Sequence, residues 1–192
     1  MSLIHIESVK TNREAFDAKV QSISRGLGIN PNWLMQAMYQ ESGLDSTIVN
    51  PASKAVGLIQ FMPATAAGLG TSPEELRRMS NVDQLTYVQK YLSAYKGKIK
   101  SYTDLYMTIF FPVAIGKPGD FELETRGLSA EKIAKQNAIY DLNKDSKITR
   151  AEVEAAILKK VPESWLPVFK TAATVGGGLI GVVAFFLPSV MF

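Results

Sequence analysis

The sequence has 192 residues, a formal net charge of +3 and no cysteine, which excludes disulfides, thiolate metal sites and thiol nucleophiles. Its one histidine, His5, lies in an N-terminal segment without a serine and aspartate context, and no glycine-rich phosphate-binding motif is present. Ser-His-Asp hydrolysis and nucleotide binding therefore have no support. The positive charge suits an anionic polymer, but the basic residues are scattered, so we expect no nucleic-acid partner.

Helix signals dominate the chain, and we expect a mainly α protein. The first predicted helix covers about 12–27, and a capping side chain or a proline marks further helix starts at Asn30-Pro31, Pro63, Pro73 and Asn81. Another helix is predicted from about Thr103 to Phe111, ending at Pro112. The segment that leads to Gln60 is expected to be a loop with brief strand pairing.

The second predicted helix places one acid on its apolar face. Leu34, Ala37, Met38 and Glu41 are spaced at i, i+3, i+4 and i+7. A carboxyl group in the interior or in a cleft loses the hydration that favours its charged form, so its pKa rises. Such a group can hold a proton near neutral pH, and we predict that Glu41 is a general acid. A structural glutamate that bonds a loop amide is the alternative.

Three motifs follow one another around this acid: Glu41-Ser42, then Gly57-Leu58-Ile59-Gln60, then Pro63-Ala64-Thr65-Ala66. Their order and spacing resemble the ES, GLxQ and PxTA motifs of the lytic transglycosylases of the lysozyme-like superfamily. The similarity covers roughly 27–117 and includes a pattern seen in phage-type members. Relatives carry a Tyr-Asn pair in a later helix, where this chain has Phe111-Pro112, and Tyr106 is the candidate substitute.

The resemblance implies that Glu41 is the only catalytic carboxylate of an enzyme that acts on peptidoglycan. It would cleave the β-1,4 bond between N-acetylmuramic acid and N-acetylglucosamine and release a 1,6-anhydro sugar. The same resemblance implies substrate-binding positions at Ser42, Gly57, Leu58, Gln60 and Tyr106. Two alternatives stay open: a water-using muramidase or endolysin with Asp45 as second carboxylate, and a virion structural protein that binds glycan without cutting it.

A second motif lies at residues 141–152 and looks like the calcium-binding loop of an EF-hand. Oxygen-bearing side chains occupy loop positions 1, 3, 5, 9 and 12, and position 7 is where EF-hands supply a backbone carbonyl. The predicted ligands are Asp141, Asn143, Asp145, Lys147, Thr149 and Glu152. Ser146 stands where glycine is usual, at a cost of about 1–2 kcal/mol for a left-handed backbone. We predict a structural calcium ion, and the alternative is a polar helix–loop–helix without one.

Residues 171–192 carry no charge, and a helix of this length would span about 33 Å, enough for a hydrocarbon core of about 30 Å. Trp165 and Lys170 precede it as interfacial anchors do. A buried helix or a tail is the alternative, because glycines at 176–178 and Pro188 weaken a helix.

Together these features predict a mainly α chain of three parts: a lysozyme-like transglycosylase domain at 1–128, an EF-hand-like segment at 129–162, and a C-terminal anchor with a transmembrane helix at 163–192. The first residues lack a cationic start and an apolar core, so we expect no secretory signal peptide. We therefore expect a membrane-associated component of a phage virion that acts at the host envelope and has other virion proteins as possible partners.

Overall fold

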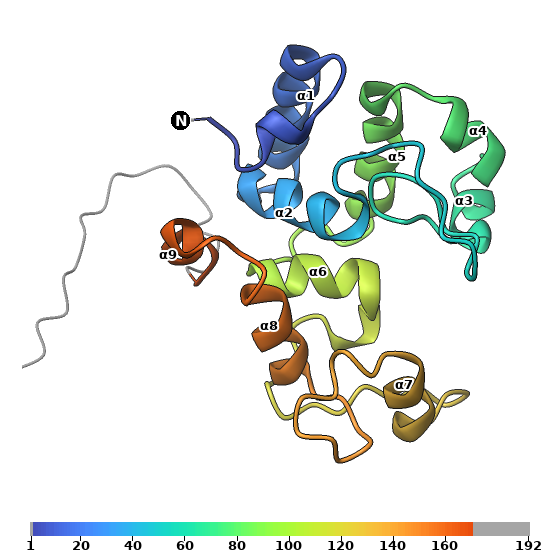
Figure 1. Cartoon of the computed structure of the whole chain (residues 1–192), viewed down its shortest axis with the longest axis vertical. Helices are drawn as coiled ribbons and strands as arrows, with labels where there is room; N and C mark the ends of the chain where they lie inside the picture. Colours follow the sequence, from blue (N-terminus) through green and yellow to red (C-terminus); the bar gives the residue numbers. More distant parts are fainter. Residues whose placement is uncertain (1, 171–192) are drawn as a thin grey trace, which may run out of the picture.

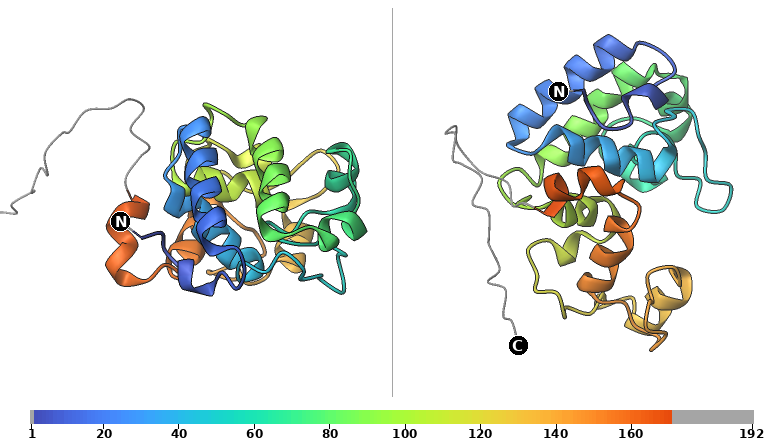
Figure 2. Two further views of the ribbon diagram at one scale, coloured as in Figure 1. Left: turned by 90° about the horizontal axis from the view of Figure 1, so that it is seen from above. Right: turned by 60° about the vertical axis from the view of Figure 1, so that its left-hand side comes forward.

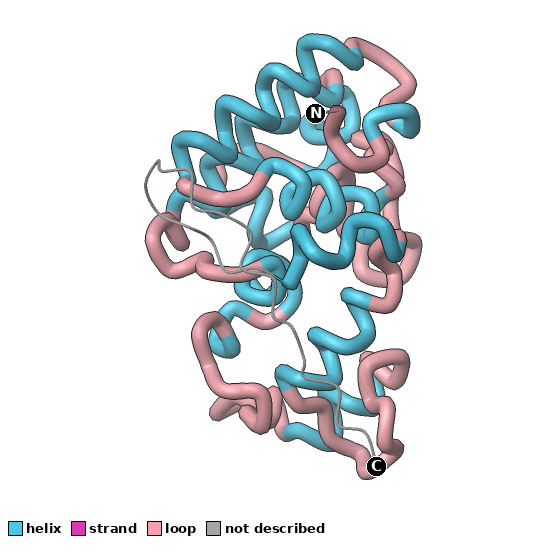
Figure 3. The backbone as a smooth tube through the Cα atoms, turned by 90° about the vertical axis from the view of Figure 1, so that its left-hand side faces the viewer, coloured by secondary structure: helices cyan, strands magenta, loops and turns pink. Residues whose placement is uncertain are grey.

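The computed structural model of the protein describes residues 2–170, in which helices provide nearly all regular structure (Figures 1 and 3). β pairing within this range is limited to isolated bridges, including Val49 with Val56 and Val56 with Phe61. The helices are α1 (Arg13–Leu27), α2 (Pro31–Ser42), α3 (Pro63–Gly68), α4 (Pro73–Arg78), α5 (Asn81–Ser93), α6 (Tyr102–Phe110), α7 (Ala130–Gln136), α8 (Arg150–Leu158) and α9 (Leu166–Lys170), with 3-10 turns at Ile6–Ser8, Pro112–Ala114 and Glu163–Trp165.

Capping explains where these helices begin and end. The Asn30 side chain accepts a hydrogen bond from the N–H of Asn32, and Pro31 occupies the first turn of α2. Gly43 ends that helix in a left-handed conformation, with φ 63°. The predicted starts of α2 to α5 are confirmed, as is the end of α6 before Pro112. α7 ends at Gln136, so Tyr140 lies in the turn that follows the helix.

The central helix of the core is α2, which has Trp33, Leu34, Met35, Ala37 and Met38 fully buried. α1 packs against α5 and α2, and α2 also packs against α6 (Figure 1). Burial on nearly every face fixes the rotation of α2 about its axis, because each buried side chain loses its packing when the helix turns. Residues that follow Met38 are therefore held in defined directions.

The chain after α6 returns to α2 and covers the edge of this helix that the other helices leave free. Gln36 Nε2 donates to the Lys160 carbonyl at 3.2 Å, Gln40 Nε2 donates to the Ile157 carbonyl at 2.9 Å, and Trp33 Nε1 donates to the Val168 carbonyl at 3.1 Å. The last described turn of the chain lies beside α2 and α6 (Figure 2). The helix that carries Glu41 is thus held from both sides.

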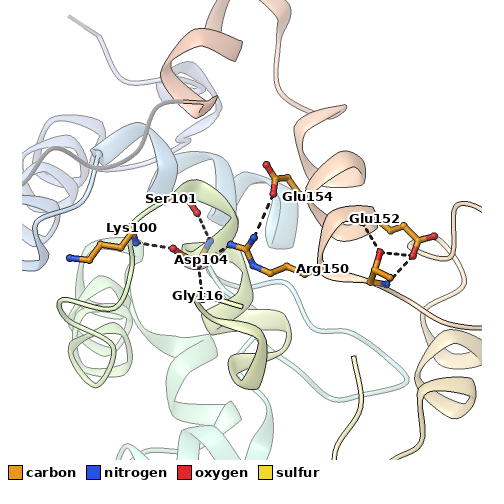
Figure 4. Close-up of polar contacts among 8 residues, drawn as sticks. Lys100, Ser101, Asp104, Gly116, Arg150, Glu152 and Glu154 are labelled. Atoms are coloured by element: carbon orange, nitrogen blue, oxygen red, sulfur yellow. Dashed lines mark hydrogen bonds and ion pairs between the residues drawn. The ribbon is translucent and has the colours of Figure 1, made fainter. Parts of the chain in front are cut away.

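One buried ion pair ties α8 to α6 (Figure 4). Arg150 Nη2 lies 2.9 Å from Asp104 Oδ1, and the two side chains are only 12% and 5% exposed. Asp104 also accepts hydrogen bonds from the backbone N–H groups of Lys100 and Gly116. The carboxylate therefore joins the start of α6, the turn after α6 and the start of α8.

Within residues 2–170, no helix is long and apolar enough to cross a membrane. The predicted anchor at 171–192 lies outside the described residues. The predicted domain boundaries at 128 and 162 stay a prediction, and the hydrogen bonds from Gln36 and Gln40 show that the parts are joined closely.

Candidate active site

A cavity of about 440 Å³ opens beside the end of α2. Its walls come from the end of α2, the loop before α3, the end of α6, and the segment around α7. The lining residues are Glu41, Asn50, Ser53, Ala55, Gln60, Met62, Ile109, Phe110, Phe111, Leu128, Ile133 and Asn137. Two of the predicted site residues, Glu41 and Gln60, meet here although the chain separates them by a long loop.

Glu41 lies at the wall of this cavity, on the face of α2 that the sequence predicted. Burial raises the pKa of Glu41 above its ordinary value, because the charged carboxylate loses hydration. A hydrogen bond with Tyr106 and the positive charge of Lys160 lower this pKa in part. The carboxyl group of Glu41 therefore holds its proton more tightly than a solvated carboxyl group does. Tyr106 and Lys160 stabilise the anion that remains after the proton leaves.

The loop that carries Gln60 is fixed from beneath by Gln84 of α5. Its Oε1 accepts a hydrogen bond from the Leu58 N–H at 2.6 Å, and its Nε2 donates to the carbonyls of Ser46 and Leu76, each at 2.9 Å. Gln84 has no exposed surface. Nothing in the spacing of the sequence motifs predicted that this residue holds the loop.

Two predicted substrate-binding residues, Ser42 and Leu58, are buried and do not line the cavity. The Ser42 hydroxyl lies 2.9 Å from the Met38 carbonyl and 3.1 Å from the Leu58 carbonyl, both of which it can bond as donor. The Leu58 side chain is fully enclosed in the core. These residues join the end of α2 to the loop, so they position the site and offer no side-chain surface to a sugar.

Gly57 and Gln60 shape the part of the loop that faces the cavity. Gly57 has φ 77°, and a Cβ atom built on it would lie 2.2 Å from Gln84 Oε1, so no other residue fits without displacement. Gln60 has φ 52°, and its Nε2 donates to the Gly57 carbonyl at 3.1 Å. The Gln60 side chain lines the cavity, as its predicted role in substrate binding requires. That role stays a prediction.

Tyr106 was predicted to contact substrate, yet it lies behind Glu41 with only 4% of its surface exposed. Its hydroxyl lies 2.7 Å from the hydroxyl of Tyr140. Burial, followed by the charge of Glu41, raises the pKa of Tyr106 far above its ordinary value, so it stays a neutral hydrogen-bond donor. The aromatic surface in the cavity comes instead from Phe110 and Phe111.

Asp45, the candidate second carboxylate, lines a different cavity. The other residues that line this cavity are Ser8, Lys10, Thr11, Gly43, Leu44, Ser46, Thr47 and Asn81. The hydroxyl and the N–H of Thr47 hold the pKa of Asp45 below its ordinary value, at distances of 2.7 and 2.8 Å. Among the described residues that line the cavity beside α2, Glu41 is the one carboxylic acid.

The sequence missed the wall formed by Leu128, Ile133 and Asn137 around α7. These residues follow the stretch in which the family motifs lie, and no spacing rule connects them to Glu41. Only the return of the chain across the end of α6 brings them to the cavity.

The predicted calcium loop at 141–152 keeps several features of an EF-hand backbone. Lys144 and Ser146 have φ 61° and 68°, and the Leu123 N–H donates to the carbonyl of the buried Ile148 at 2.8 Å. The Glu152 carboxylate accepts hydrogen bonds from the N–H groups of Leu142 and Thr149, and with Thr149 it forms a capping box at the start of α8. No three His, Cys, Asp or Glu side chains converge on a metal position anywhere in residues 2–170.

A helical lobe with one partly buried acid at the wall of an open cavity agrees with the expectation of a lysozyme-like enzyme that cleaves glycans. The comparison with known families narrows this class. Residues 19–109 match the model described as the transglycosylase SLT domain, so this part of the chain is a lysozyme-like lytic transglycosylase domain. An SLT domain implies a lytic transglycosylase, an enzyme that acts on peptidoglycan. No solved structure matches the chain.

Proposed function

We propose that the protein cleaves the β-1,4 bond between N-acetylmuramic acid and N-acetylglucosamine and forms a 1,6-anhydro product, with Glu41 as both acid and base. The observation that carries this proposal is the solitary acid: no second carboxylate joins Glu41 among the described residues of the cavity wall. Hydrolytic glycosidases generally use two carboxyl groups, one of which activates water or attacks the sugar. One carboxyl group suffices when the nucleophile belongs to the substrate.

The two steps use Glu41 in opposite protonation states. Protonated Glu41 gives its proton to the glycosidic oxygen, and the bond from that oxygen to C1 of the muramic acid breaks. The Glu41 carboxylate then accepts the proton of the C6 hydroxyl, whose oxygen forms a new bond to C1. No water is consumed. The raised pKa of Glu41 favours the first step, and the hydrogen bond with Tyr106 stabilises the anion between the steps.

The neighbouring side chains supply the sugar-binding surface in this proposal. Gln60, Asn50 and Ser53 offer hydrogen-bonding groups in the cavity wall, and Phe110 and Phe111 offer apolar faces. Gly57 and Leu58 act through the backbone of the loop, which Ser42 and Gln84 hold in place. We therefore expect Gln60→Ala to raise KM more than it lowers kcat.

The direct test is Glu41→Gln, which keeps the size of the side chain and removes its ability to donate a proton. We expect release of soluble muropeptides from purified peptidoglycan to be lost while glycan binding persists. Asp45→Asn is the matched control and should retain activity, because Asp45 faces another cavity. Mass spectrometry of the products separates the two chemistries: anhydro-muropeptides support the proposal, whereas reducing-end muramic acid together with loss of activity in Asp45→Asn supports a hydrolase. Full activity of Glu41→Gln contradicts the assignment of the acid.

We also propose that the loop at 141–152 binds a structural calcium ion. Support comes from the oxygen-bearing residues at the EF-hand positions and from the left-handed backbone at Lys144 and Ser146. Asp141, Asn143, Asp145, the Lys147 carbonyl, Thr149 and Glu152 would hold the ion, which would brace the turn between Tyr140 and α8. Calcium should then raise the melting temperature in a concentration-dependent way, magnesium should do so less, and Asp141→Asn combined with Asp145→Asn should lose the effect. An unchanged melting temperature in millimolar calcium contradicts this proposal.

A further part of the proposal concerns where the enzyme works. We propose that it opens the cell wall locally as a component of a phage particle, with residues 171–192 held in a membrane. Support comes from the phage-type pattern of the motifs and from the absence of charge in 171–192. Mass spectrometry should find the protein in purified particles, and the full chain should float with lipid vesicles whereas a chain ending at Lys170 should not. Absence from particles contradicts the phage role.

A further inference from the structure

Tyr140 makes a contact that neither the family motifs nor the proposed reaction assigns. It lies beyond α7 and outside the matched residues 19–109, yet its hydroxyl reaches the hydroxyl of Tyr106 at 2.7 Å. Tyr140 is 5% exposed, and its ring lies 4.8 Å from the ring of Phe110, so packing fixes its position. A residue from the end of the α7 segment is therefore held one hydrogen bond away from Tyr106, the side chain that lowers the pKa of Glu41.

Counting protons gives a direction to this chain of hydroxyl groups. A tyrosine hydroxyl has one proton to donate, and when Tyr106 donates to ionised Glu41 the proton of Tyr106 is used. The 2.7 Å contact must then use the proton of Tyr140, with the Tyr106 oxygen as acceptor. Donation from Tyr140 polarises the Tyr106 hydroxyl and strengthens the bond that it gives to the carboxylate.

We propose that Tyr140 is a positioning residue of the active site, which acts through Tyr106 to hold and strengthen the hydrogen bond to the Glu41 carboxylate. The proposal rests on the function proposed for Glu41. It gives the segment from 121 to 140 a part in the reaction: this segment closes one wall of the cavity with Leu128 and Ile133, and its last residue completes the polar network behind the acid.

Several other groups near Glu41 also influence the stability of its carboxylate. Tyr102 and Tyr106 of α6, Tyr140 beyond α7 and Lys160 in the turn after α8 interact electrostatically with Glu41. Lys160 favours the carboxylate by its charge alone. A tyrosine-to-phenylalanine variant removes a hydroxyl group without changing the net charge. Such a variant therefore separates the effect of the hydrogen bond from Tyr106 from the effect of the Lys160 charge.

The test begins with Tyr140→Phe, which keeps the ring against Phe110 and removes only the hydroxyl. We expect kcat to fall about three- to tenfold, the effect of one hydrogen bond, with KM nearly unchanged. The Glu41 carboxylate loses stabilisation, so the pH at which activity falls on the alkaline side should move up by about 0.5 to 1 unit. Tyr91→Phe is the control, because the Tyr91 hydroxyl donates to the Thr108 carbonyl and not to Tyr106. It should leave the alkaline limb in place.

A double variant separates positioning from general loss of structure. If Tyr140 acts through Tyr106, then Tyr140→Phe added to Tyr106→Phe should produce no further shift of the pH profile and little further loss of kcat. Additive effects overturn the proposal, as does an unshifted alkaline limb in Tyr140→Phe alone. The outcome is independent of the assignment of the acid, because failure of that assignment appears as residual activity in Glu41→Gln, whatever the tyrosine variants do.

Discussion

Gln84 and Gly57 fit together so closely that each fixes the other: the Gln84 amide occupies the space where any side chain at position 57 would begin. The amide oxygen accepts the N–H of the next residue, Leu58, at 2.6 Å. The loop that carries Gln60 to the cavity is therefore built on a buried side chain of α5, and its position depends on a contact between two residues far apart in the sequence.

Gly57→Ala tests this contact. The new methyl group requires Gln84 to move, which leaves the Leu58 N–H and two carbonyls without their partner, and φ of 77° adds backbone strain. We expect a loss of about 3 kcal/mol or more in the free energy of unfolding, together with lower activity. Gly70→Ala is the matched control: φ is 78° there, but only Lys90 Nζ lies within 4.0 Å, so about 1–2 kcal/mol is expected. Equal urea midpoints for both variants would contradict the role of Gln84.

Ser42→Ala separates positioning from sugar binding. Because the Ser42 hydroxyl bonds the carbonyls of Met38 and Leu58 inside the protein, its loss should lower stability by about 1–2 kcal/mol and leave KM nearly unchanged. Ser93→Ala removes a similar bond to the Gln89 carbonyl at an exposed position and should have little effect. Urea unfolding and steady-state kinetics measure both quantities. A large rise in KM for Ser42→Ala without loss of stability would restore the predicted sugar contact.

Glu41→Gln should stabilise the protein at neutral pH, because it removes a carboxylate from a partly buried position. The pKa of Glu41 is raised in the folded state, so the folded chain binds more protons than the unfolded chain between the ordinary and the raised pKa. Stability contributed by the protonated acid is complete below the ordinary pKa and falls as pH rises through the raised one. The melting temperature of Glu41→Gln should therefore exceed that of the wild type at pH 7 to 8 and approach it below about pH 4. The exposed Glu124→Gln should show no such divergence; equal curves for Glu41→Gln and wild type would refute the effect.

Arg150→Met tests the ion pair between α8 and α6. The change leaves the Asp104 carboxylate buried without its cation, and we expect a loss of about 3 kcal/mol in the free energy of unfolding. Adding Asp104→Asn should recover part of this loss, because it removes the unpaired buried charge, and the amide oxygen can still accept one of the two N–H groups, of Lys100 and Gly116, that the carboxylate accepts. Lys147→Met breaks the exposed pair with Glu122 and should change stability little. A loss no larger for Arg150→Met than for Lys147→Met would show that the pair does not join these helices.

Local chemistry made much of the helical fold predictable. Prolines and capping side chains opened α2 to α5, Gly43 and Pro112 ended α2 and α6, and the spacing of Leu34, Ala37 and Met38 placed Glu41 on the correct face. These features act within a few residues, so one sequence is enough to read them. The predictions weakened where a residue's environment comes from elsewhere: Leu58 and Tyr106 were expected at the sugar and are buried.

The sequence by itself determined the helix that carries Glu41 and the face on which this residue lies, and it contains the motifs that resemble the family, because each of these features depends on neighbours within one or two helical turns. Only the tertiary structure decided that Gln84 supports the loop, that Asp45 faces another cavity, and that Tyr140 reaches the network behind Glu41. Those relationships depend on how distant segments pack, and no local pattern encodes the distance between two side chains that the fold brings together.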